Sequence, residues 1–71
     1  MKNRLRELRI NTNKSQEDVA KAVGSTARSL IRYEACQTDP SLEMAMRLAA
    51  YYQKSVDYVF KYEPYKGGDH Q

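Results

Sequence analysis

Cysteine, histidine and long apolar runs are scarce in this sequence, and each scarcity excludes a class of protein. The single cysteine, Cys36, cannot form an intrachain disulfide, which favours a reducing compartment and a cytoplasmic protein. One cysteine and one histidine, His70, give no metal-ligand spacing. No apolar run approaches the roughly 18 residues of a membrane helix. The charged N-terminus, MKNRLRELRI, does not resemble a secretory signal.

Groupings of residues typical of catalysis are missing as well. The chain shows no Ser/His/Asp set, no pair of carboxylates placed for a cleft and no glycine-rich phosphate loop. We therefore predict no enzyme activity, no cofactor and no metal. A chain of 71 residues is expected to form one small domain, because it cannot bury two independent cores.

Basic residues are concentrated in the first half of the chain, although the net charge is only +3. Residues 1–32 carry eight bases and three acids, a net of +5, whereas residues 33–71 carry four bases and six acids, a net of −2. Six of the seven aromatic residues lie between residues 51 and 65. This distribution indicates a basic N-terminal surface for a polyanion and a separate aromatic surface for a second partner.

The pattern of apolar residues predicts an all-α fold with five helices. Capping residues and helical spacing place them at residues 2–11, 16–23, 27–34, 42–52 and 56–60. The expected helix caps, whose hydroxyl groups accept from otherwise unpaired amides, are Ser15, Thr26, Ser41 and Ser55. In the fourth helix, the apolar residues repeat at helical spacing: Leu42, Ala45, Leu48, Ala49 and Tyr52.

Residues 15–34 (SQEDVAKAVGSTARSLIRYE) predict two short helices that meet across a tight turn. Ala20 is small where the helices approach each other, and Gly24 suits the turn because glycine adopts positive φ at little cost. Val19, Val23 and Leu30 are expected to form a shared core. This arrangement is a helix-turn-helix, whose second helix enters the major groove of DNA.

Helical periodicity separates the two faces of the helix at residues 27–34. If Leu30 and Tyr33 lie inside, then Arg28 and Arg32, four residues apart, project together from the opposite face. Arginine is the side chain best suited to contact guanine O6 and N7 together. The residues expected to face the bases are Ala27, Arg28, Ile31 and Arg32.

Together these residues resemble the Cro/CI-type (XRE) helix-turn-helix regulators. The resemblance covers about residues 3–60 and rests on Ser15-Gln16-Glu17, Ala20, Gly24, Thr26, Leu30, Arg32-Tyr33-Glu34 and Asp39-Pro40-Ser41-Leu42. It implies a lambda-repressor-like, five-helix DNA-binding domain. The sequence is also similar to a short subgroup of the family, in which the fifth helix leads into an aromatic C-terminal strand.

The resemblance implies a role for each residue of this surface. The residue matching Gln16 clamps a DNA phosphate in the family, and the pair matching Arg9 and Glu34 bridges the first and third helices. Positions matching Ala27, Arg28 and Arg32 read bases. The full set of expected phosphate contacts is Gln16, Lys14, Thr26, Ser29, Gln37 and Thr38.

Two departures from the family pattern leave the main target open. Ala35-Cys36 stands where the family often has Asn-Gly, which removes a phosphate contact and the residue best suited to end a helix. Ile31 is apolar on the exposed face, where it could contact a thymine methyl or a protein. The first hypothesis is a repressor of phage or mobile-element type. The alternative is an antirepressor that acts mainly by binding another regulator.

The C-terminal aromatics suggest how two copies of the chain associate. Tyr52 and Phe60 are expected in the core, whereas Tyr58, Tyr62 and Tyr65 either cover it or form a homodimer interface. Residues 60–64 alternate in polarity, which predicts a short β-strand paired with residues 1–3. We expect the helix-turn-helix domain to span residues 1–63, with a flexible tail at 64–71, and a homodimer to bind a palindromic DNA operator.

Overall fold

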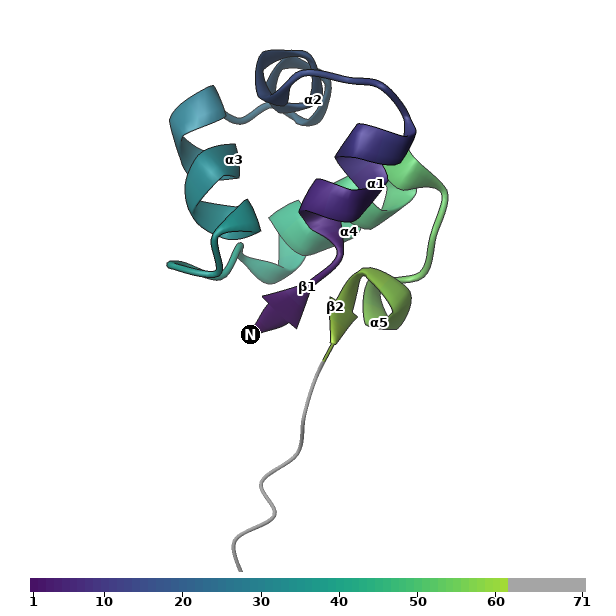
Figure 1. The fold of residues 1–71 in the computed structure, drawn as a ribbon. Coiled ribbons are helices and arrows are strands. Elements are labelled where there is room, and N and C mark those ends of the chain that lie inside the picture. The colour runs from purple at the N-terminus through teal and green to yellow at the C-terminus, as the bar shows by residue number, and fades with distance from the viewer. Residues whose placement is uncertain (62–71) are drawn as a thin grey trace, which may run out of the picture.

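The computed structural model describes residues 1–61, and it consists of five helices with one short two-stranded sheet (Figure 1). In chain order the elements are β1 (Lys2–Asn3), α1 (Leu5–Asn11), α2 (Gln16–Val23), α3 (Ala27–Glu34), α4 (Leu42–Tyr52), α5 (Val56–Val59) and β2 (Phe60–Lys61). The predicted fold class is therefore confirmed. The predicted tail at residues 64–71, like Tyr62 and Tyr65, lies outside the described residues.

Hydroxyl caps start four of the five helices, as the sequence predicted. Ser15 forms a reciprocal pair with Asp18: the Asp18 amide donates to Ser15 Oγ at 3.0 Å, and the Ser15 amide donates to Asp18 Oδ2 at 3.4 Å. Thr26, Ser41 and Ser55 likewise accept from backbone amides three residues later. Each cap satisfies an amide that the helix itself leaves unpaired, so the helix boundaries follow from local chemistry.

One apolar core joins all five helices and the second strand. Its buried members are Leu5, Leu8, Val19, Ala20, Val23, Leu30, Ala45, Leu48, Ala49, Tyr52, Val59 and Phe60. The core positions expected for Tyr52 and Phe60 are confirmed. Leu42 belongs to the apolar repeat of α4 but is its first residue and stays 74% exposed, because the burial of α4 begins one turn later at Ala45.

The first helix is shorter than predicted, since it begins at Leu5 and not at residue 2. The Arg4 amide donates to the carbonyl of Val59 at 2.7 Å, and the Leu5 amide donates to the side-chain oxygen of Asn3 at 3.0 Å. These contacts hold Lys2–Asn3 extended. Helix propensity favours a helix that begins at residue 2, but the pairing of Lys2–Asn3 with Phe60–Lys61 outweighs it.

The sheet joins the two ends of the described chain. β1 and β2 are antiparallel, with Lys2 opposite Lys61 and Asn3 opposite Phe60. This confirms the predicted strand over Phe60–Lys61, whereas residues 62–64 lie outside the described residues. The predicted helix at 56–60 ends one residue earlier, because Phe60 takes part in the strand.

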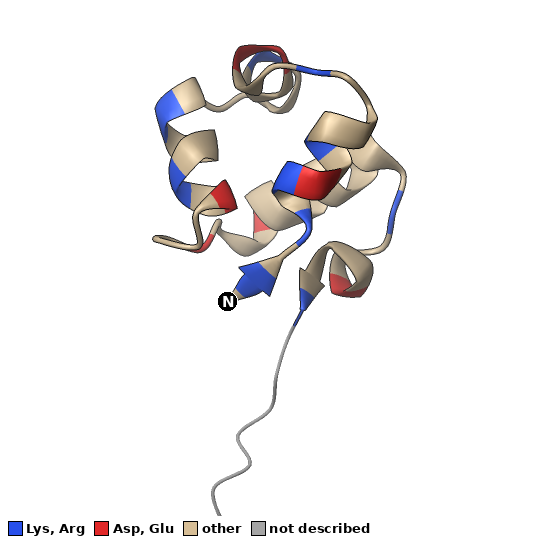
Figure 2. Ribbon diagram, in the orientation of Figure 1, with Lys and Arg blue, Asp and Glu red and all other residues tan. Residues whose placement is uncertain are grey.

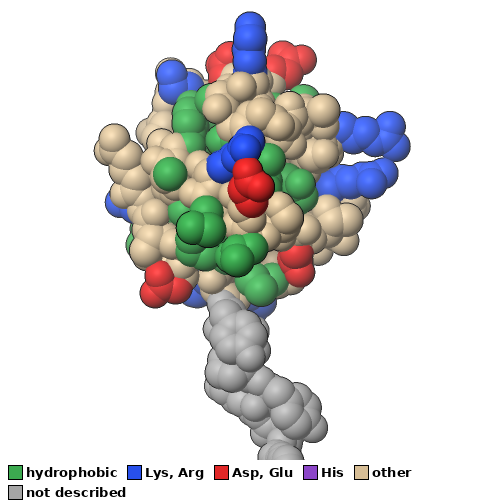
Figure 3. Space-filling view, turned by 180° about the vertical axis from the view of Figure 1, so that it is seen from behind, with side chains coloured by type: hydrophobic (Ala, Val, Ile, Leu, Met, Phe, Trp, Pro, Cys, Tyr) green, Lys and Arg blue, Asp and Glu red, His purple; other side chains and the backbone are tan. Residues whose placement is uncertain are grey.

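The face that carries α4 displays apolar side chains. Figure 3 shows them gathered on the side opposite the viewer of Figure 1, around a small number of charged groups. On α4 the exposed apolar residues are Leu42 and Met46, which are 74% and 55% exposed.

Within residues 1–61, none of the helices has the length and apolar content needed to cross a membrane.

Candidate DNA-binding surface

The turn between α2 and α3 brings the two helices together in a fixed arrangement. Gly24 ends α2 with φ of 77°, in the left-handed region that glycine adopts most readily. The amide of Ser25 then donates back to the carbonyl of Ala20 at 2.8 Å. Ala20, only 3% exposed, leaves the space that close packing of these helices requires. The two helices therefore form a helix-turn-helix.

The third helix has one buried side and one exposed side. Leu30 is fully buried and Tyr33 is half-buried against the core, whereas Arg28, Ile31 and Arg32 are exposed. Ala27, expected on the exposed face, is half-buried. Figure 2 shows the two basic positions along α3, with an acidic residue at its end. Within residues 1–61, the side chains of Arg28 and Arg32 have no hydrogen-bond or ion-pair partner, which leaves both guanidinium groups available to a ligand.

The expected phosphate contacts lie at the ends of these helices. Lys14 and Gln16 border the N-terminus of α2, and Thr26 and Ser29 border that of α3. Thr26 Oγ1 accepts from the Ser29 amide and donates to Ser29 Oγ, both at 3.1 Å. Gln37 and Thr38 are exposed in the loop after α3. Amides at helix N-termini attract anions, so this placement suits a phosphate backbone.

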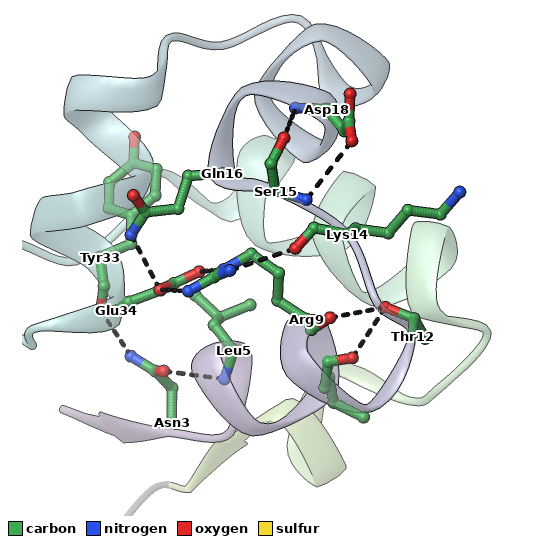
Figure 4. A network of polar contacts seen from close by, with 11 residues as sticks. Asn3, Leu5, Arg9, Thr12, Lys14, Ser15, Gln16, Asp18, Tyr33 and Glu34 are labelled. Carbon is green, nitrogen blue, oxygen red and sulfur yellow. Dashed lines mark hydrogen bonds and ion pairs between the residues drawn. The ribbon is translucent and has the colours of Figure 1, made fainter.

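A charged network ties α1, α2 and α3 together at Glu34 (Figure 4). Arg9 Nε donates to Glu34 Oε2 at 2.7 Å, and Arg9 Nη2 donates to Glu34 Oε1 at 3.1 Å. Arg9 Nη1 also donates to the carbonyl of Lys14 at 3.1 Å. The hydrogen bonds that Arg9 donates to Glu34, and the negative charge of this carboxylate, raise the pKa of Arg9, so its guanidinium stays charged. The pair fixes α3 relative to α1.

Gln16 is the third partner of the same carboxylate. Its side-chain nitrogen donates to Glu34 Oε1 at 3.1 Å, so three donors surround one carboxylate whose side chain is 4% exposed. Four residues singled out in the sequence therefore meet here: Arg9, Lys14, Gln16 and Glu34. This contact orients the Gln16 amide nitrogen and leaves its second hydrogen free to donate elsewhere.

A buried tyrosine is electrostatically coupled to this network. Tyr52 is 7% exposed, and its hydroxyl has no hydrogen-bond partner among the described residues. Burial, and then the negative charge of Glu34, raise the pKa of Tyr52 to about 12. Its phenol therefore stays neutral over the physiological range, beneath the Arg9–Glu34 pair.

Sequence reasoning missed Asn3, which the structure places against the end of α3. Its side-chain nitrogen donates to the carbonyl of Tyr33 at 2.8 Å. The N-terminal amine of Met1 also lies 3.3 Å from Asp39 Oδ1, in the loop after α3. Two signals placed residue 3 outside a helix: the low helix propensity of asparagine and the predicted pairing of residues 1–3 with the C-terminal strand. Its contact with α3 depends on the tertiary fold.

The residues that the structure describes offer no candidate metal site, and their cysteine lies in the turn after α3. Among residues 1–61, no group of three or more His, Cys, Asp or Glu side chains could hold a metal ion. Cys36 is an exposed free thiol with φ of 60°, in the left-handed region. This is the position at which the family often has glycine, so Cys36 occupies a turn without the residue that suits it best.

Fold and surface together define a helix-turn-helix DNA-binding protein. The family model described as helix-turn-helix matches residues 5–59. The chain therefore belongs to the XRE (Cro/CI-type) helix-turn-helix family of DNA-binding transcriptional regulators, which are not enzymes.

Individual relatives support this assignment. An uncharacterized HTH-type transcriptional regulator of Methanocaldococcus jannaschii is 36% identical over 63 residues, which span 89% of this chain and 96% of that protein. An HTH-type transcriptional regulator of Archaeoglobus fulgidus is 29% identical over 63 residues, 89% of each chain. The P22 c2 repressor, solved in complex with synthetic operator 9T, is similar with a TM-score of 0.79 and 29% identity. The match covers 82% of this chain and 88% of that one.

Proposed function

We propose that this protein is a sequence-specific repressor of phage or mobile-element type, which inserts α3 into the major groove of an operator. The observation that carries the proposal is the exposed pair Arg28 and Arg32, without partners within residues 1–61, on a helix whose other side is fixed in the core. Guanidinium groups in this position can contact guanine in the groove. The likeness to the P22 c2 repressor, solved with operator DNA, supports this reading.

We assign base contacts to Ala27, Arg28, Ile31 and Arg32, although Ala27 is half-buried and contributes less surface than the others. Phosphate contacts fall to Lys14, Gln16, Thr26, Ser29, Gln37 and Thr38, which lie at helix ends or in the adjoining loop. Phosphate contacts position a protein on DNA, whereas base contacts carry sequence preference. The protein would act in the cytoplasm.

A homodimer on a palindromic operator belongs to the same proposal. Two copies of α3 would lie about 34 Å apart, one helical turn of DNA. A largely apolar groove near the sheet supports association; it is lined by the acidic Asp39 and by Met1, Pro40, Leu42, Ala45, Val56 and Phe60. Tyr58 is 38% exposed and lies beneath the guanidinium of Arg4, 4.5 Å from the ring centre. Sedimentation of only an 8.2 kDa species at tens of micromolar would exclude the dimer.

The test of DNA binding starts from a randomised duplex library, from which the wild-type protein selects its preferred sequence. The selected duplex and a shuffled duplex of equal composition are then titrated by fluorescence anisotropy at two salt concentrations. We expect nanomolar, salt-sensitive binding of the selected duplex and binding of the shuffled one that is at least about a thousandfold weaker. Equal affinity for both duplexes would reject sequence-specific recognition.

The second candidate is an antirepressor that masks another regulator. Two observations favour it: Ile31 is 49% exposed on the recognition face, and α4 exposes Leu42 and Met46. In that case Arg28 and Arg32 would pair with acidic side chains of the partner. Weak binding of every duplex, together with nanomolar binding to a second purified helix-turn-helix regulator of the same genome, would favour the antirepressor.

A further inference from the structure

The side chain of Asn3, the last residue of β1, contacts the start of α1 and the end of α3 (Figure 4). Its nitrogen donates to the carbonyl of Tyr33, near the end of α3, at 2.8 Å, and more weakly to Cys36 Sγ at 3.7 Å. Its oxygen accepts from the amide of Leu5, the first residue of α1, at 3.0 Å. Because Asn3 also belongs to β1, this one side chain links the sheet, α1 and the recognition helix.

The end of α3 is one of three helix ends within residues 1–61 that turn through a non-glycine residue at positive φ. Carbonyls of the last helical turn lack partners within the helix. Here the chain turns with Cys36 at φ of 60°, a conformation that costs free energy for every residue except glycine. The Cys36 amide donates to the backbone carbonyl of Tyr33 at 3.1 Å, and the Gln37 amide donates to the backbone carbonyl of Arg32 at 3.0 Å. Asn3 adds a second donor to the Tyr33 carbonyl.

The sheet holds Asn3 in the position that makes this contact possible. Asn3 lies opposite Phe60 of β2, and Phe60 is only 7% exposed. The next amide, of Arg4, donates to Val59 at 2.7 Å. Beyond the strand, the Met1 amine lies 3.3 Å from Asp39, in the loop that contains Gln37 and Thr38. The first residues of the chain therefore brace the loop after α3 from the side of the sheet.

We propose that Asn3 is a positioning residue for DNA binding. Its hydrogen bonds fix the end of α3 and the loop after it relative to the β1–β2 sheet. It does not touch DNA itself. The inference rests on the proposed function, because it assigns to Gln37 and Thr38 the phosphate contacts that Asn3 keeps in place. It also makes the second strand, at the far end of the described chain, part of the support for the DNA-facing surface.

The test uses Asn3→Ser in the full chain. A serine hydroxyl still accepts from an amide two residues later, so the start of α1 is retained, but the side chain is too short to donate to Tyr33. The change also leaves the charge of the protein unaltered. The matched control is Ser55→Ala, which removes the cap of α5 and lowers stability but keeps the hydrogen bonds of the Asn3 side chain.

Two measurements separate positioning from general destabilisation. Amide hydrogen exchange is followed at Cys36 and Gln37, and affinity is measured for the duplex selected by the wild type, at a temperature where every variant is fully folded. For Asn3→Ser we expect exchange at both amides to accelerate and affinity to fall about fivefold, the effect of one ordinary hydrogen bond. Ser55→Ala should leave both quantities within about twofold of the wild type.

Each result decides one of the two claims. A wild-type protein that selects no duplex overturns the proposed function, and with it the role of Asn3 in DNA binding. If the wild type selects a duplex that Asn3→Ser binds equally well, the positioning role alone is overturned. Equal losses of affinity in Asn3→Ser and Ser55→Ala would also overturn it, because the effect would then follow stability.

Discussion

The side-chain nitrogen of Gln16 donates to Oε1 of Glu34 across the interface between α2 and α3, at 3.1 Å. An amide that faces a carboxylate must present its nitrogen and not its oxygen, so the orientation of Gln16 is set before any ligand binds. The carboxylate would repel a nearby phosphate, but two hydrogen bonds from Arg9 compensate its charge. The residue expected to clamp DNA is therefore oriented by the same pair that fixes the recognition helix.

Replacing Gln16 tests this arrangement. Gln16→Ala removes the proposed phosphate donor. Because a phosphate contact carries no sequence information, affinity should fall by about 1 kcal/mol for the selected duplex and for any single-base variant of it. Fluorescence anisotropy against a panel of single-base variants measures both effects. Met46→Ala, on the exposed side of α4, is the control and should change neither. A changed order of preference within the panel would show that Gln16 reads bases.

Two glutamates of this chain allow a comparison of buried and exposed ion pairs. Glu34→Ala leaves Arg9 partly buried without its partner and should lower the free energy of unfolding by about 3 kcal/mol. Glu43→Ala breaks the exposed pair of Glu43 with Arg47, in which the Arg47 side chain is 50% exposed and the Glu43 side chain is 74% exposed. This change should lower the free energy of unfolding by less than about 0.5 kcal/mol. Urea unfolding measures both values. Equal losses would mean that the Arg9–Glu34 pair contributes no more than a surface contact.

Alkaline pH should destabilise the protein through Tyr52. Its folded-state pKa of about 12 lies above the ordinary tyrosine value of 10.0, so the neutral phenol is favoured by folding. This contribution is complete below pH 10 and is lost as the pH rises towards 12, by an amount on the order of 2 kcal/mol. Tyr52→Phe removes the titrating group and also an unpaired buried hydroxyl. Its stability should therefore fall less steeply over this range, and parallel pH profiles would contradict the assignment.

The turn after α3 can be stabilised by one substitution. Cys36→Gly should raise the free energy of unfolding by about 1 kcal/mol, because glycine adopts the left-handed conformation without the penalty of a Cβ atom. Asn13, with φ of 59°, provides the matched control. Asparagine tolerates this region better than cysteine does, so Asn13→Gly should gain less. Thermal unfolding of both variants measures the difference, and a loss of stability in Cys36→Gly would show that the thiol contributes to the turn.

The helices could be predicted from the sequence because their boundaries depend on local chemistry. Ser15, Thr26, Ser41 and Ser55 each cap a helix through an amide three residues away, and Gly24 ends α2 at positive φ. Contacts between distant residues were harder to predict. Asn3 and Tyr33 are separated by 30 residues, and no local pattern indicates that one accepts from the other.

In the candidate DNA-binding surface, too, features set by local sequence could be predicted and contacts between distant residues could not. Periodicity predicted that Ile31 is exposed and Leu30 is buried, because both follow from the helical repeat. The Arg9–Glu34 pair was expected only from the family resemblance. The contact of Gln16 with Glu34 was not expected at all, since it depends on the angle at which α2 packs on α3. The early start predicted for α1 was wrong because strand pairing overrides helix propensity at residues 2–3.

The most direct test of the central claim, that α3 reads guanines in the major groove, is methylation interference on the selected duplex. A methyl group at guanine N7 occupies the acceptor that an arginine would contact. For the wild type we expect interference at specific guanines of each half-site. Arg32→Ala should abolish it at one of them and weaken binding by about 1–3 kcal/mol. Arg6→Ala removes the same charge from an exposed position on α1 and should leave the pattern intact. An interference pattern that is identical in the wild type and Arg32→Ala would contradict the claim that Arg32 of α3 contacts a guanine.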